Sequence, residues 1–224
     1  MPLILILVEC GLELIPKSLR ENPKIKSLLR EKTYACQLLD NALHHFAMNK
    51  LKNYQKRGRP DIVHLCLLNA LGSVLNKRNH LELYIHTIKN RIFKFNPEIR
   101  IARNYNRFKG LMAKLLIDGH IGTKTEELIS PVGNSLKKII QSYQNPKILV
   151  FSRRGKQLLD YRELYTENLD DNIIAIIGGF QKGTYSNQIS NLSKELISLS
   201  SLSLDAWVVV YKTIEYYELK HKII

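Results

Sequence analysis

The chain has 224 residues, of which 34 are Lys or Arg and 20 are Asp or Glu, so its formal net charge at pH 7 is +14. Hydrophobic residues make up 45% and charged residues 24%, a composition that excludes wholesale disorder and predicts one elaborated domain or two small ones. The charge predicts a polyanionic partner, and the alternative is a merely well-solvated basic surface.

The first segment, 3–9, is predicted to be a buried strand. Its apolar run is short, no basic residue precedes it and Glu9 follows, which does not fit a signal peptide, and no stretch of the sequence approaches membrane-spanning length. Cys10, Cys36 and Cys66 lie far apart and form no Cys-x-x-Cys pair. We therefore expect neither a disulfide framework nor a zinc ribbon, and a reducing cytoplasmic location fits best.

Residues 16–31 are basic and are expected to form a helix or an irregular excursion, whereas 41–51 is expected to be helical. Four of the histidines in the first half of the chain are candidate metal ligands, but no two of these four have the i, i+4 spacing that places two imidazoles on one helix face. We expect structural roles and no metal site for these four residues, which are His44, His45, His64 and His86.

The segment 55–61, with the sequence QKRGRPD, is predicted to be an exposed loop because glycine and proline interrupt regular structure there. The nearly continuous apolar run 62–73 and the alternating run 81–88, separated by a turn cluster at 76–79, predict a β-hairpin. Residues 91–95 are expected to add a third strand.

The clearest helix follows, because five apolar residues repeat at i, i+3, i+4, i+7 and i+8, namely Phe108, Leu111, Met112, Leu115 and Leu116. Arg100, Arg103 and Arg107 share helical spacing and point about a third of a turn away from that stripe. Between residues 50 and 110 there are 14 basic side chains against three acidic ones. This concentration favours a phosphate-binding row over ordinary surface arginines.

After residue 118 the chain is predicted to be a loop-rich connector followed by a helix at 136–143. Apolar strands are then expected to alternate with helices, which indicates a parallel sheet whose ligand crevice lies at the carboxyl ends of the strands. The expected strands are 148–151, 173–177 and 196–199, and the expected helices are 157–164 and 204–219.

A glycine-rich turn, 176–185 (IIGGFQKGTY), follows one of these strands. It lacks both the G-x-G-x-x-G and the P-loop spacing. Its glycines permit positive φ and close approach of a flat ligand to the backbone, although a tight turn without a ligand explains them equally well. The loop 199–204 (LSSLSL) lies at the same predicted edge and suits an adenosine moiety or a plain helix entry.

Six blocks in this order resemble one family: RGRPDIVH (57–64), LLNALGSVLN (67–76), YIHT (84–87), NPEIRIARNYNRFKGLM (96–112), IIGGF with Gly183, and the serine-leucine loop before Ala206 and Trp207. The chain resembles the SPOUT-class (alpha/beta-knot) ribosomal RNA pseudouridine N1-methyltransferases of small-subunit biogenesis. The similarity covers nearly the whole chain.

The resemblance implies an α/β SPOUT methyltransferase fold with a mainly parallel sheet. It further implies a single domain over 1–224, a basic, β-rich and helical elaboration at about 40–110 and a C-terminal trefoil knot at about 146–224. It also implies the cofactor S-adenosyl-L-methionine, a homodimer and small-subunit ribosomal RNA as the substrate. A ribosome-assembly RNA-binding protein whose methylation is secondary or lost is the alternative. Stoichiometric cofactor binding separates the two.

Site residues follow from the resemblance position by position. The RNA contacts implied are Arg59, Arg100, Arg103 and Arg107, and Asp61 is implied either to orient Arg59 or to take the proton from the pseudouridine N1. Cofactor contacts are implied for Gly178, Gly183, Leu199, Ser200, Ser201, Leu202, Ser203 and Leu204. Two departures from the family pattern are Val74, where proline is usual, and Asp205, where a neutral residue is commoner.

Overall fold

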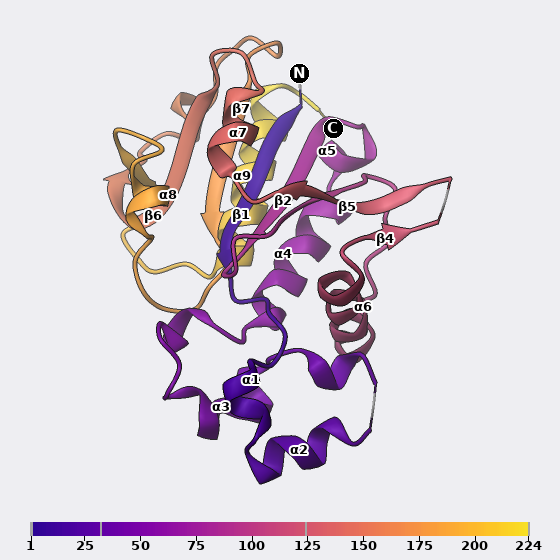
Figure 1. The fold of residues 1–224 in the computed structure, drawn as a ribbon. Coiled ribbons are helices and arrows are strands. Elements are labelled where there is room, and N and C mark those ends of the chain that lie inside the picture. Colours follow the sequence, from indigo (N-terminus) through magenta and orange to yellow (C-terminus); the bar gives the residue numbers. More distant parts are fainter. Residues whose placement is uncertain (1, 32, 124, 224) are drawn as a thin grey trace.

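The computed structural model describes residues 2–31, 33–123 and 125–223, and its centre is one eight-stranded sheet (Figure 1). The strands lie in the order β4-β5-β3-β2-β1-β7-β6-β8. Their bounds are β1 (Leu3–Cys10), β2 (Leu81–Thr87), β3 (Ile92–Phe95), β4 (Ile121–Gly122), β5 (Glu127–Gly133), β6 (Lys147–Gln157), β7 (Ile173–Gly178) and β8 (Leu196–Ser198).

The sheet is mostly parallel, as predicted. Strands β2, β1, β7, β6 and β8 pair in parallel, and β3, β5 and β4 continue the sheet in antiparallel fashion. The carboxyl ends of β1 and β7 point toward the same end of the molecule, away from both chain termini (Figure 1). Ligand sites of parallel sheets form at this edge.

Strand β1 is buried along its whole length, and its side chains alternate between two cores. Leu3, Leu5 and Leu7 join the core beneath α4, α6 and α9, whereas Ile4 and Ile6 join the core beneath α7 and α8. The sheet is therefore the middle layer of three. The helices of these layers are α4 (Pro60–Gly72), α6 (Tyr105–Asp118), α7 (Leu136–Gln141), α8 (Asn187–Ser190) and α9 (Ala206–Lys220).

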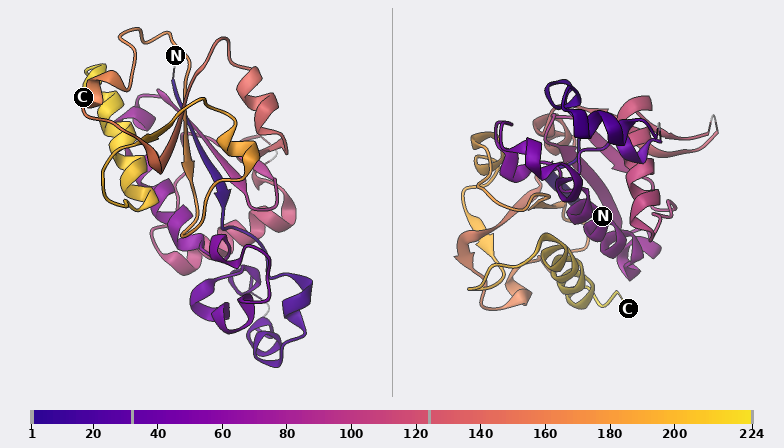
Figure 2. Two further views of the ribbon diagram at one scale, coloured as in Figure 1. Left: turned by 90° about the vertical axis from the view of Figure 1, so that its left-hand side faces the viewer. Right: turned by 90° about the horizontal axis from the view of Figure 1, so that it is seen from below.

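A small helical lobe extends from the carboxyl end of β1 and lies below the sheet in Figure 1 and in the left view of Figure 2. It contains α1 (Lys17–Arg20), α2 (Pro23–Leu29), α3 (Asn41–Met48) and the 3-10 turns η1 (Ala35–Gln37) and η2 (Tyr54–Lys56). Its own core is formed by Ile15, Leu19, Ile25, Leu39, Ala47 and Met48. The chain then returns to the sheet through α4 and α5 (Val74–Lys77).

The predicted hairpin of 62–73 with 81–88 is wrong, because 60–72 is the helix α4. A continuous apolar run does not distinguish a buried strand from a buried helix. Pro60 occupies the first helical turn, and seven side chains of α4 are buried because the helix packs against the sheet and also against α9, its neighbour on the same face. The antiparallel partner of β2 is instead β3, the strand expected at 91–95.

The helix expected at 157–164 is also absent. Strand β6 continues to Gln157, which pairs with Ser198 of β8, and the chain then makes a single 3-10 turn, η3 (Tyr161–Glu163). The carboxylate of Asp160 accepts a hydrogen bond from the backbone N–H of Arg162 and stabilises that turn. The connector after residue 118 likewise contains strand structure, β4 and β5, before the expected helix α7.

Candidate functional site

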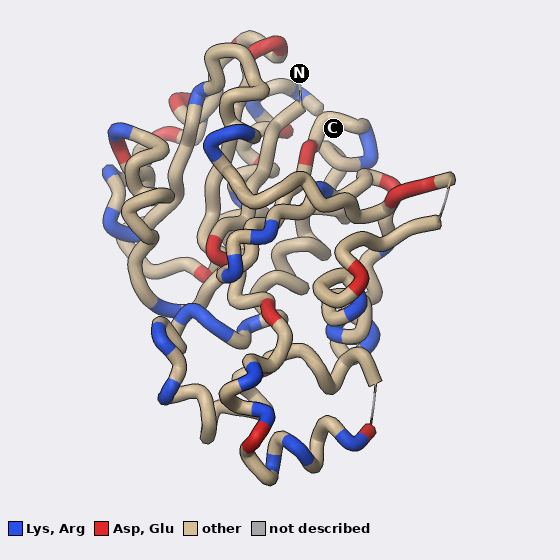
Figure 3. The backbone as a smooth tube through the Cα atoms, in the orientation of Figure 1, with Lys and Arg blue, Asp and Glu red and all other residues tan. Residues whose placement is uncertain are grey.

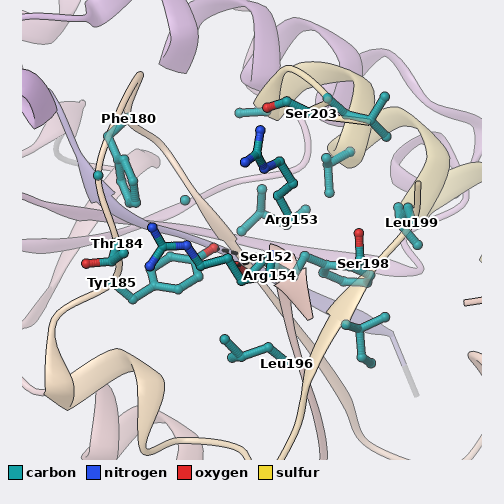
Figure 4. A pocket seen from close by; sticks show the side chains of 18 of the residues that line it. Ser152, Arg153, Arg154, Phe180, Thr184, Tyr185, Leu196, Ser198, Leu199 and Ser203 are labelled. Atoms are coloured by element: carbon teal, nitrogen blue, oxygen red, sulfur yellow. Dashed lines mark hydrogen bonds between the residues drawn. The ribbon is translucent and has the colours of Figure 1, made fainter. Parts of the chain in front are cut away.

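A cavity of about 500 Å³ opens at the carboxyl ends of β6, β7 and β8. Seven of the eight residues predicted to contact a cofactor line it, namely Gly178, Gly183, Leu199, Ser200, Leu202, Ser203 and Leu204, whereas Ser201 is not among the lining residues. Phe180, Thr184 and Tyr185 form one wall, and Ser198, Leu199 and Ser203 form the opposite side (Figure 4). Segments that are distant in sequence therefore meet around one space.

Glycine is required at two positions of the glycine-rich turn. A Cβ on Gly178 would lie 2.8 Å from the ring of Phe180, which is too close for real side chains, and would push that ring. Gly183 has a φ of +118°, a conformation that L side chains rarely adopt. These constraints fit a tight turn with or without a ligand, so the contact of these glycines with a cofactor stays a prediction.

Tyr185 fixes the wall of the cavity. Its hydroxyl donates a 2.7 Å hydrogen bond to the carbonyl of Phe151 in the middle of β6, and its ring packs edge-on against Phe180 at 5.6 Å. Burial raises the pKa of this hydroxyl, so it remains a neutral donor at physiological pH. Sequence reasoning missed Tyr185 because it considered only the glycines of the turn.

Arg153 and Arg154 also line the cavity, and their guanidinium groups lie between its two walls (Figure 4). Both side chains are exposed, and neither is paired with a carboxylate within the described ranges. They supply positive charge beside a partly apolar space. The signal for them in the sequence is a pair of arginines one residue after the predicted strand 148–151.

The second predicted site begins at Arg59, immediately before α4. Its Nε lies 2.8 Å from Oδ1 of Asp61 and its second terminal nitrogen lies 2.6 Å from Oδ2, which is a bidentate ion pair. The hydrogen bonds with Asp61 are the main cause that raises the pKa of Arg59. Asp61 lies in the first turn of α4, where the helix dipole favours a carboxylate. Both carboxylate oxygens are therefore occupied by the arginine.

The helical spacing predicted for the arginine row is wrong, because α6 begins at Tyr105: Arg100 and Arg103 precede the helix, and only Arg107 lies in its first turn. Arg100, Arg103 and Arg107 are exposed, and in the described part of the chain none of them forms an ion pair. Asn104 caps the helix by accepting a 3.1 Å hydrogen bond from the backbone N–H of Arg107. Free cations on an ordered backbone are suited to phosphate binding.

Histidine and lysine side chains position this row. His64 of α4 forms a 2.7 Å hydrogen bond with the carbonyl of Ala102 and stacks on Phe108 at 4.3 Å. Lys109 of α6 is buried and lies 3.1 Å from Asp40 of the lobe, and Tyr105 donates to the same carboxylate. The structural role expected for His64 is confirmed, and α6 is held against the lobe as well as the sheet.

The basic segment that carries Arg59 runs where the lobe meets the sheet, and Lys and Arg follow one another along it (Figure 3). It faces the carboxyl ends of β1 and β7 (Figure 1). The negative charge of Asp205, which follows the cofactor loop, contributes to the raised pKa of Arg59. The guanidinium of Arg59 is therefore close enough to the cofactor loop to respond to the charge of Asp205.

Among the described residues, no three His, Cys, Asp or Glu side chains gather as they would around a metal ion. His44 and His86 instead accept backbone hydrogen bonds through Nδ1, from Asp40 and Glu9 respectively. None of the helices formed by the described residues has both the length and the apolar character needed to cross a bilayer.

This geometry defines a class: an α/β protein that holds a small ligand at its strand ends and a polyanion beside it. The model of the EMG1/NEP1 methyltransferase family matches residues 5–218, so the chain belongs to that family.

Named relatives agree. The chain is 39% identical over 217 residues to "Ribosomal RNA small subunit methyltransferase Nep1" of Staphylothermus marinus, covering 95% of this chain and 94% of the relative. It is 37% identical to the protein of the same name from Thermococcus sibiricus, covering 96% of each. The solved structure of Archaeoglobus fulgidus Nep1 bound to S-adenosylhomocysteine matches with a TM-score of 0.86 and 32% identity, over 98% of this chain and 99% of that one.

Proposed function

We propose that this protein transfers a methyl group from S-adenosylmethionine to N1 of a pseudouridine in small-subunit ribosomal RNA. The observation that carries the proposal is a cofactor-sized cavity in a chain of the EMG1/NEP1 methyltransferase family that also presents exposed arginines without ion pairs among its described residues. The solved relative was bound to S-adenosylhomocysteine, which is the product that remains when S-adenosylmethionine gives up its methyl group.

The cavity fits the cofactor. Its volume of about 500 Å³ lies within the range of small-molecule sites, which is about 300 to 1,000 Å³. The glycine turn offers backbone groups to the methionine part, and the loop 199–204 offers small polar and apolar groups to the adenosine part. When bound, S-adenosylmethionine supplies an electrophilic methyl group, so the protein contributes mainly positioning.

Arg59, Arg100, Arg103 and Arg107 bind the RNA around the target nucleotide. A stacked base does not present its N1, so the pseudouridine must be splayed out of the RNA, and arginines that bind the flanking phosphates hold it there. Asp61 orients Arg59, because both of its oxygens accept hydrogen bonds from that guanidinium. We therefore assign Asp61 a positioning role and not the role of a base.

The chain acts as one SPOUT methyltransferase domain over 1–224, with a basic RNA-binding elaboration at 40–110 and a trefoil knot at 146–224. The match to a solved relative over nearly the whole of both chains supports this proposal. So does the sheet order, in which β6 lies between β7 and the last strand β8. Its cysteines include two that are buried and free, Cys10 and Cys66, which suits action in a reducing cytoplasm.

The protein acts as a homodimer. A groove of about 540 Å³ runs between α4 and α9 and is lined in part by Leu68, Val74, Ile214 and Leu219. Leu219 is 51% exposed, and apolar side chains on neighbouring helices suit a second copy of the same surface. Leu219→Glu is expected to give a monomer in analytical ultracentrifugation, whereas Leu159→Glu, at a leucine exposed by 91%, should leave the dimer intact. A dimer for both variants would contradict the proposal.

Methylation of paired RNA oligonucleotides tests the function. One RNA carries pseudouridine at the target position and the other carries uridine, and mass spectrometry locates the methyl group. We expect N1-methylpseudouridine from the first RNA and no product from the second, and Gly178→Val should abolish the product. Tight RNA binding without cofactor binding or methylation would indicate an assembly factor instead.

A further inference from the structure

The carboxyl end of β1 joins the cofactor turn to the RNA-binding loop. The N–H of Gly11 donates a 3.0 Å hydrogen bond to the carbonyl of Gly179, and the carbonyl of Gly11 accepts a 2.9 Å hydrogen bond from the N–H of Arg59. A Cβ on Gly11 would lie 2.6 Å from the carbonyl oxygen of Lys56, so this close approach requires glycine. One residue thus contacts both halves of the site through its backbone.

Glu9 makes the same connection through its side chain. It is 5% exposed, and its backbone has a φ of +50°, which is uncommon outside glycine and marks a constrained position. Its Oε2 lies 2.5 Å from Nζ of Lys56, and its Oε1 accepts a 3.0 Å hydrogen bond from the N–H of Ser186. Burial acts to raise the pKa of Glu9, but these hydrogen bonds outweigh it and hold the pKa below its usual range.

Lys56 lies against the wall of the cofactor cavity. Its Nζ is 4.7 Å from the centroid of the Phe180 ring, and its Cε is 3.1 Å from where a Cβ on Gly183 would be. Phe180 and Gly183 both line the cavity. Lys56 also belongs to the loop 55–61, three residues before Arg59. This loop is not exposed as predicted, because Arg57 within it is buried and forms a bidentate ion pair with Glu13, and its last two residues begin α4. A ligand that fixes the cavity wall therefore also fixes this lysine and the loop that carries it.

We infer that Glu9 and Lys56 are positioning residues that couple the two binding events, so that S-adenosylmethionine and RNA bind with positive cooperativity. The inference rests on the proposed function. Both ligands favour the arrangement in which the loop 55–61 and the turn 178–186 are joined, so the ligand that binds first bears the cost of ordering them. Linkage requires that each ligand raise the affinity of the other by the same factor.

Calorimetry with S-adenosylhomocysteine, with and without saturating pseudouridine-containing RNA, measures this factor. We expect RNA to tighten cofactor binding by at least about fivefold in the unaltered protein, the lower end of typical coupling. Lys56→Met keeps the apolar stem but removes the ammonium group, and Glu9→Gln keeps the shape but removes the charge. Both variants should reduce the factor to about one, and Lys56→Arg should retain most of it.

Lys52→Met is the matched control, because Lys52 is exposed and precedes the same loop. It removes one positive charge and is expected to weaken RNA binding without changing the factor. Thermal unfolding monitors folding in each variant, and Glu9→Gln serves as the second probe if Lys56→Met does not fold. A factor of one in the unaltered protein, or an unchanged factor in folded Lys56→Met or Glu9→Gln, would overturn the inference. Methylation of the same RNA by the unaltered protein in a separate reaction with S-adenosylmethionine would leave the proposed function standing.

Discussion

The ion pair between Arg59 and Asp61 gives the sharpest test of how the RNA site is built. Asp61→Asn makes the protein more positive by one charge, so a purely Coulombic effect would tighten RNA binding. We expect the opposite, because the variant loses the carboxylate that fixes the guanidinium of Arg59 in one orientation.

The magnitude follows from the geometry. The pair has two charge-assisted hydrogen bonds, of 2.8 and 2.6 Å, but the Asp61 side chain is 40% exposed and that of Arg59 is 18% exposed. Hydrogen bonds to charged groups contribute about 1.5 to 3 kcal/mol, and exposed ion pairs contribute less than about 1 kcal/mol. A loss of about 1 to 2 kcal/mol in RNA binding corresponds to about a 5- to 30-fold weaker affinity.

Fluorescence anisotropy at fixed salt measures the affinity, and single-turnover methylation with saturating RNA measures the chemical step. Arg59→Ala should show a similar loss, and the double variant should be no worse than Arg59→Ala alone, because Asp61 acts through Arg59. Asp118→Asn, at the exposed end of α6, controls for the change in charge. If the losses of RNA affinity in Asp61→Asn and Arg59→Ala add up in the double variant, Asp61 does not act through Arg59 and its positioning role is refuted. A collapse of the chemical step in Asp61→Asn with RNA affinity intact would make Asp61 the base.

Three further predictions follow from the site and the core. Arg103→Ala and Arg107→Ala should each reduce the slope of log affinity against log salt by about one unit, and an unchanged slope in both would contradict the phosphate-binding row. Gly178→Val should abolish S-adenosylhomocysteine binding in calorimetry, because the added side chain meets the Phe180 ring. RNA binding without cofactor should stay within a few fold of the unaltered protein. Normal cofactor binding by this variant would mean that the cavity is misassigned. Burial lowers the pKa of His44 and His86 in the folded protein. Below the pKa of an unfolded-chain histidine, about 6.5, the unfolded chain therefore binds more protons than the folded protein does. The free energy of unfolding from urea titrations should therefore be greatest above that pH and fall as the pH is lowered toward 5.5, and a rise would contradict this sign.

The elements that were predicted correctly are those with a clear periodic signal. Strands β1 and β7 are short apolar runs bounded by glycine, and α6 has a single apolar stripe, so local sequence is sufficient for them. Helix α4 was mistaken for a strand because it is covered on several sides and lacks the polar face that distinguishes a helix from a strand. Because segments distant in sequence cover α4, its sequence has no amphipathic pattern that would identify it as a helix.

The candidate site shows the same division. The arginine row and the glycine turn stand out locally, and the structure brings them to one edge of the sheet. Glu9 and Lys56 were not singled out, because their importance depends on a contact between residues 47 positions apart and on a strand order that no local pattern encodes. Tyr185 was missed for the same reason, since its partner is the middle of β6.

The helical lobe has a consequence for how such a protein diversifies. It is an insertion in the crossover between two parallel neighbours, β1 and β2, and the entropy of closing a longer loop rises only slowly with its length. Its six-residue core is too small to fold alone, so the lobe depends on the sheet for stability. No strand of the eight-stranded sheet belongs to the lobe. The crossover is therefore a position where the surface beside the sheet is exchanged or enlarged by insertion while the strands that build the cofactor cavity keep their register.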